Sequence, residues 1–143
     1  MSEAERIVSA VKTALMGATA AGDRVTRSLG RVLSFTEFPC ILLQQKRDIP
    51  MPGAPIGFEY RRLLLVVEVS AEGDPRGAVE VSPHEACGPV HAQAHGLLNR
   101  TAAELGLSIE SGAVDWDFDE ENAELGLCQA EYWIDYRRQA GAL

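Results

Sequence analysis

The sequence predicts an α+β fold, in which two main helices pack on one face of a mostly antiparallel β-sheet. Two stretches repeat apolar residues with helical spacing, and several others alternate them with the period of a strand. These patterns follow one another in the order helix, strands, helix, strands. A chain of 143 residues with 46% hydrophobic residues suits a single domain, residues 1–143, with one core.

The first helix is predicted at the start of the sequence. Ser2 suits the N-cap position, and Gly17 or Gly22 can end the helix. Its apolar face is made by four residues, Ile7, Val8, Val11 and Leu15. This face is expected to cover part of the sheet.

Two strands and a loop are expected next. Residues 24–29 are weakly strand-like, and residues 38–44 (FPCILLQ) form a second, apolar strand that tolerates Pro39 at its start. Residues 49–57 carry three prolines and two glycines, which cannot hold a helix or an inner strand. We therefore expect a flexible loop over about residues 45–57, or the tip of a long hairpin.

Residues 59–70 (EYRRLLLVVEVS) are predicted to be the central strand of the sheet. One side of this strand is wholly apolar: Leu63, Leu65, Val67 and Val69. The other side is apolar only in its middle: Arg62, Leu64, Val66 and Glu68. The first side is expected to face the core, and the half-apolar side to meet a covering element or a partner chain.

A second helix is predicted after turn residues 71–77. Ser82 and Glu85 have the spacing of a capping box, with Pro83 at the first helical position, and a helical stripe runs on toward Gly106. The Gly88-Pro89 pair is awkward inside this helix, because proline clashes with the preceding turn. The sequence therefore predicts a kink there, or a helix that begins near Pro89.

The last segment predicts an antiparallel hairpin with one buried face on each strand. In residues 114–119 (VDWDFD), apolar side chains alternate strictly with aspartates. Residues 128–137 alternate in the same way, with Cys128, Ala130, Tyr132, Ile134 and Tyr136 on one side.

Composition excludes several classes of protein. A formal net charge of −8 argues against a basic nucleic-acid surface. The three cysteines are isolated, so neither a disulfide framework nor a zinc ribbon is indicated. No apolar run reaches the roughly 20 residues that cross a bilayer, so no membrane partner is expected.

Two groups of side chains in the sequence could bind a metal ion. His84, Cys87, His91 and His95 are metal-ligand types on one helical face, although Gly88-Pro89 interrupts that face and no HExxH motif is present. The aspartates of residues 115–119 fail the calcium-loop pattern. No nucleophile motif or phosphate loop appears. We therefore expect no enzyme, with no catalytic, cofactor-binding or metal residues; a small metal- or ligand-binding domain using the His/Cys cluster is the alternative from another class.

Three windows, in their order, resemble the tail terminator family of long-tailed phages, of the lambda type. They are the strand entry Glu37-Phe38-Pro39-Cys40-Ile41, the long strand 60–69 after a proline- and glycine-rich loop, and residues 114–136 with their closing Tyr-Trp-Ile-Asp-Tyr. With the N-terminal helix, the resemblance covers nearly the whole chain. Residues 81–106 depart from it, through Gly88-Pro89 and the histidines.

The resemblance implies a structural protein, without a cofactor, that works in the host cytoplasm during assembly and then in the virion tail. Such proteins form a six-membered ring on the tail tube, stop tube polymerisation and offer a docking surface to a head-completion or neck protein. DNA passes through the ring, and a net-acidic ring would let it slide without sticking. A head–tail connector or another minor tail protein is the alternative within this class.

The half-apolar sheet face and the predicted loop would serve the contacts with neighbouring subunits or with the tube. The hypothesised interface residues are Lys46, Arg47, Met51, Arg62, Leu64 and Val66. The competing interpretation is that the chain's own loop covers this face.

Overall fold

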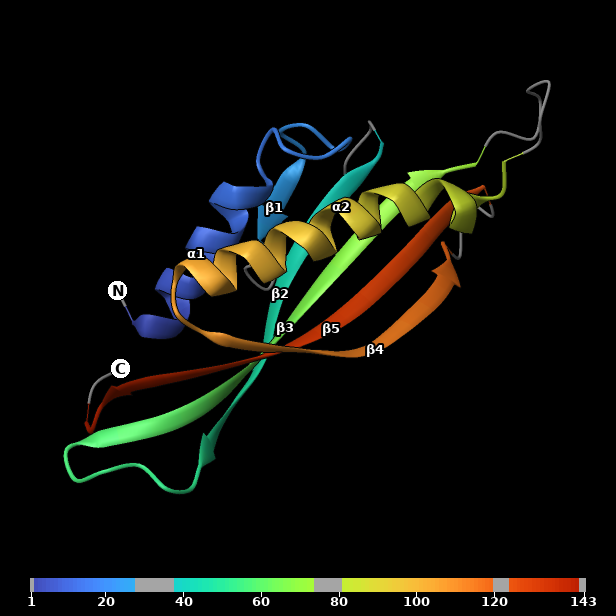
Figure 1. Ribbon diagram of the computed structural model, residues 1–143. Coiled ribbons are helices and arrows are strands. Elements are labelled where there is room, and N and C mark those ends of the chain that lie inside the picture. The colour runs from blue at the N-terminus through green and yellow to red at the C-terminus, as the bar shows by residue number, and fades with distance from the viewer. Residues whose placement is uncertain (1, 28–37, 74–80, 120–123, 142–143) are drawn as a thin grey trace.

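A computed structural model describes residues 2–27, 38–73, 81–119 and 124–141. Within these ranges, two helices and five strands form the α+β fold that the sequence predicted (Figure 1). The sheet order is β1-β2-β3-β5-β4, with β1 parallel to β2 and the other neighbours antiparallel. In chain order the elements are α1 Glu3–Leu15, β1 Val25–Arg27, β2 Cys40–Met51, β3 Phe58–Glu72, α2 Pro83–Glu104, β4 Ser108–Phe118 and β5 Leu125–Gln139.

Both helices lie on the same face of the sheet, and the core fills the space between the helices and the sheet (Figure 1). β3 is the central strand of the sheet, between β2 and β5, as predicted. Its predicted core side chains, from Leu63 to Val69, are at most 1% exposed. The predicted apolar side of β5 joins the same core: Cys128, Ala130, Tyr132, Ile134 and Tyr136.

The first helix has the predicted boundaries. The Ser2 hydroxyl accepts a hydrogen bond from the Glu5 backbone N–H at 3.2 Å, and the helix ends at Leu15. Gly17 follows with φ of +71°, a conformation that glycine adopts without a steric penalty. Arg27 of β1 pairs with the Glu5 carboxylate, and this pairing lowers the pKa of Glu5.

The second helix is continuous from Pro83 to Glu104, so the expectation that it begins near Pro89 is wrong. Ser82 caps it as predicted, accepting from the Glu85 N–H at 3.2 Å. Pro89 has no N–H to donate, but it lies in the second turn, and the buried Cys87 and Val90 hold that turn on the sheet. Packing therefore outweighs the local cost of proline.

The predicted flexible loop over residues 45–57 is also wrong in part, because β2 continues to Met51. The alternative interpretation, the tip of a long hairpin, describes residues 52–57. β1 pairs only with Ile41–Leu43, so the rest of β2 is a sheet edge, where a residue without an N–H such as Pro50 is tolerated. Residues 46–62, with residues 135–139 of β5, form a projection past the helices, which we call the arm (Figure 1).

β4 pairs with β5 as predicted, but the apolar side of β4 is not buried. Val114, Trp116 and Phe118 remain 39%, 45% and 46% exposed. A helix with its side chains is about 10 Å wide and strands lie about 4.8 Å apart, so two helices cover about four strands. The edge strand β4 is therefore left mostly uncovered by the helices.

None of the described helices is long and apolar enough to cross a membrane.

Candidate assembly surface

The sheet face opposite the helices carries most of the residues predicted for an interface. Four of them, Lys46, Arg47, Leu64 and Val66, line one hollow of about 340 Å³. The remaining walls of the hollow also come from strands: Gln44, Asp115, Gln129 and Glu131. Among the described residues, no helix or loop lines this hollow.

The floor of the hollow is apolar and its rim is charged. Val66 is 7% exposed and Leu64 is half-buried, which is unusual for aliphatic side chains on a face that no described helix covers. The strand register accounts for this burial, because long side chains lie opposite the pair on both sides: Gln44 and Arg47 on β2, and Glu131 and Trp133 on β5.

Lys46 and Arg47 are exposed at the irregularity of β2. The strand register shifts between Gln45 and Arg47, so Lys46 is an extra residue and Arg47 lies opposite Leu64. No described carboxylate lies within 4.0 Å of either cation. Both charges are therefore available to a partner.

Arg62, by contrast, is already engaged within the protein. Its guanidinium donates to both carboxylate oxygens of Asp135, at 2.8 and 3.2 Å, and lies 6.0 Å from the centre of the Trp133 ring. The hydrogen bond to Asp135 raises the pKa of Arg62. Arg62 therefore joins β3 to β5 on this surface, and few of its N–H groups remain to donate hydrogen bonds to a partner.

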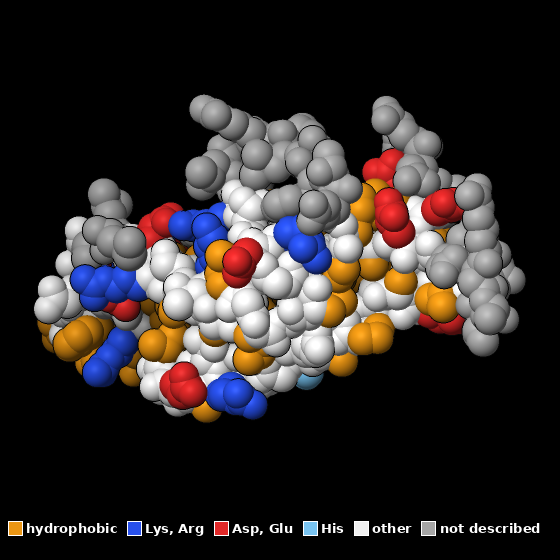
Figure 2. Space-filling model, turned by 90° about the horizontal axis from the view of Figure 1, so that it is seen from above, with side chains coloured by type: hydrophobic (Ala, Val, Ile, Leu, Met, Phe, Trp, Pro, Cys, Tyr) orange, Lys and Arg blue, Asp and Glu red, His pale blue; other side chains and the backbone are white. Residues whose placement is uncertain are grey.

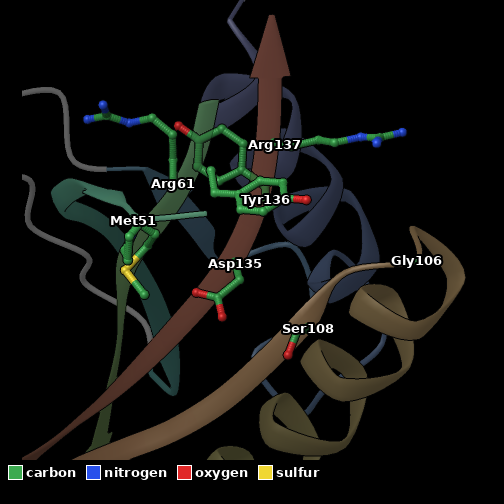
Figure 3. Close-up of a pocket in the computed structure, with 9 residues that line it drawn as sticks. Met51, Arg61, Gly106, Ser108, Asp135, Tyr136 and Arg137 are labelled. Carbon is green, nitrogen blue, oxygen red and sulfur yellow. The ribbon is translucent and has the colours of Figure 1, made fainter. Parts of the chain in front are cut away.

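Met51 belongs to a different hollow of about 370 Å³ at the base of the arm (Figure 3). In Figure 3 the Arg61 and Arg137 side chains extend in opposite directions from this hollow. Arg61 donates to the Asp48 carboxylate at 2.9 Å, and the Tyr136 hydroxyl donates to the same carboxylate. Burial, followed by the contact with Asp48, raises the pKa of Tyr136 to about 12. This network holds β2, β3 and β5 together where the arm leaves the body.

The four residues of the His/Cys cluster, the alternative considered from the sequence, do not point to one place: His84 and His91 both pack beside Trp116, whereas Cys87 lies in the core. The Cys87 thiol points into the core, 3.4 Å from the Gly126 carbonyl oxygen, and burial raises its pKa to about 11. His84 stacks on Phe118 with ring centres 4.3 Å apart, and Nδ1 of His95 lies 3.0 Å from the Tyr132 hydroxyl. No group of three or more metal-ligand side chains forms among the described residues.

One surface was missed by sequence reasoning. His84 of α2 packs beside the exposed side of β4, and together they form what we call the aromatic patch: His84, Val114, Trp116 and Phe118. The alternation of residues 114–119 predicts a buried strand face, which the structure contradicts at these positions. The signal for the patch is the helix count, since two helices are too few to cover five strands.

No protein-family model and no curated protein matches this chain. The fold defines it as an α+β domain whose two described helices lie on one face of the sheet.

Proposed function

We propose that this protein is a structural component of a phage tail, which assembles as a ring on the tail tube, stops tube polymerisation and offers a docking surface to the head. The proposal combines the resemblance in three sequence windows with the properties of the sheet face opposite the helices. It places the protein in the host cytoplasm during assembly and in the virion afterwards.

The observation that carries the proposal is the hollow around Leu64 and Val66. An apolar floor with a charged rim is the usual arrangement of a protein–protein contact. The rim contains both signs of charge, Lys46 and Arg47 against Asp115 and Glu131, which suits contacts of defined register. The arm adds support, because a projection can reach a neighbouring subunit in a ring. The net charge of −8 also adds support, because an acidic channel would not bind DNA tightly.

The test uses Leu64→Glu, which places a charge on the floor of the hollow. Tail tubes assembled without a terminator are incubated with each protein, and tube length and capped ends are scored by electron microscopy. The wild type is expected to stop elongation, and Leu64→Glu to remain folded yet fail to cap.

Ala92→Glu is the matched control, because it adds the same charge at an exposed position of α2. It is expected to cap normally. Unimpaired capping by Leu64→Glu would count against this surface, and failure of the wild type on any tube would count against the function. Tail-tube and tape-measure genes are expected beside the gene for this protein.

A further inference from the structure

Two exposed apolar surfaces lie at opposite ends of the molecule (Figure 1). One is the tip of the arm, where Ile56 is fully exposed and Phe58 and Tyr60 are 39% and 37% exposed. The other is the aromatic patch at the start of α2 and the end of β4. Neither is covered by a described part of the chain, although each exposes aromatic rings, which are enriched in protein contacts.

The two ends also carry opposite charge. On the arm, Asp48, Glu59 and Asp135 are each paired with an arginine. No described carboxylate lies within 4.0 Å of the remaining cations of the arm, Lys46, Arg47 and Arg137. The net charge of the arm is therefore positive.

Around the aromatic patch the charge is negative. Residues 81–99 and 112–119 contain no lysine or arginine, but they include Glu85, Asp117 and Asp119. In Figure 2 acidic side chains gather toward the right-hand end, with no described Lys or Arg drawn among them. An acidic, aromatic surface at one end thus matches a basic, apolar surface at the other.

The backbone edges of the sheet favour contact through side chains rather than through strand addition. β2 has a bulge at Lys46 and a proline at position 50 on its free edge, and the register of β4 shifts between Ser111 and Val114. Bulges, charges and prolines on edge strands prevent a second chain from pairing in register. The exposed rings and charges are what remains for recognition.

We propose that the arm tip of one copy docks on the aromatic patch of a second copy, with Ile56 and Phe58 against Trp116 and Phe118. The contact is heterologous, since it joins two different surfaces, and such contacts close into rings or extend as filaments. This inference rests on the self-assembly in the proposed function. It leaves the hollow around Leu64 free to meet the tail tube.

Cross-linking between two singly substituted proteins tests the contact. Ala54→Cys places a thiol beside the arm tip, and Ala113→Cys places one beside the patch, and both leave the apolar rings intact. The native cysteines are buried, and burial raises the pKa of all three thiols, to about 11 for Cys87 and Cys128, so a short bis-maleimide is expected to spare them.

The mixture of Ala54→Cys and Ala113→Cys is expected to give at least about tenfold more cross-linked dimer than Ala54→Cys with Arg100→Cys, an exposed position on α2. Adding Ile56→Asp to the first protein, or Trp116→Asp to the second, is expected to reduce the yield to that of the control. Circular dichroism checks that these exposed substitutions leave the fold intact.

Charge reversal provides the rescue. Glu85→Arg beside the patch is expected to lower the yield, and Arg137→Glu beside Phe58 of the arm tip is expected to restore it. A yield no higher than the control at millimolar protein, or a dominant tip-to-tip or patch-to-patch product, would overturn the proposed contact.

The outcome is separable from that of the proposed function. Leu64→Glu is expected to keep the cross-link and lose capping. Capping without the cross-link would refute this contact alone, whereas the cross-link without capping would refute the tail function alone.

Discussion

The contrast between Leu65 and Leu64 measures directly whether the second sheet face is open. These neighbours in β3 point to opposite faces, and Leu65 is fully buried while Leu64 is half-buried. Replacement by alanine removes three carbons from each, about 0.8 kcal/mol per carbon when burial is complete. At Leu65 a cavity adds to this loss, for a total of about 3–5 kcal/mol.

At Leu64 the shortened side chain is expected to leave no sealed cavity, because no described helix or loop covers the hollow. Leu64→Ala is therefore expected to cost about 1–2 kcal/mol. Urea unfolding followed by circular dichroism measures both free energies of unfolding, with a shared slope as the check that the unfolded states are comparable. Equal costs at the two positions would refute the open face and restore the interpretation that the chain covers it.

Two further predictions concern the helix start and alkaline pH. Ser82→Ala is expected to lower the free energy of unfolding by about 1 kcal/mol, because the Glu85 backbone N–H loses its hydrogen bond to the Ser82 hydroxyl. Ser82→Asp is expected to keep the wild-type stability, because aspartate also caps helices. Equal stability of the wild type and Ser82→Ala would contradict this capping role. The pKa of Tyr136 is raised from 10.0 to about 12, so the fold favours the neutral phenol. Its contribution to stability is present below pH 10 and is lost as pH rises through about 12, a loss that Tyr136→Phe should reduce in urea titrations across that range.

Much of the fold follows from local patterns. The period of Leu63–Val69 determines which side of β3 is buried, and the hydroxyls of Ser2 and Ser82 determine where the helices start, because these effects act within a few residues. The same patterns misjudged Pro89 and residues 45–51. In both places contacts from distant parts of the chain, the core around Cys87 and the pairing of β2 with β3, outweigh a local preference.

For the candidate surfaces too, some features follow from the sequence and others only from the tertiary structure. The sequence by itself determined that one side of β3 is half-apolar, and so pointed to Leu64 and Val66. Only the tertiary structure decided that Lys46 and Arg47 join them in one hollow, that Arg62 is held by Asp135, and that Met51 lies elsewhere. It also decided that Trp116 and Phe118 stay exposed, since coverage depends on how many strands two helices can span, and alternation along one strand carries no information about its neighbours.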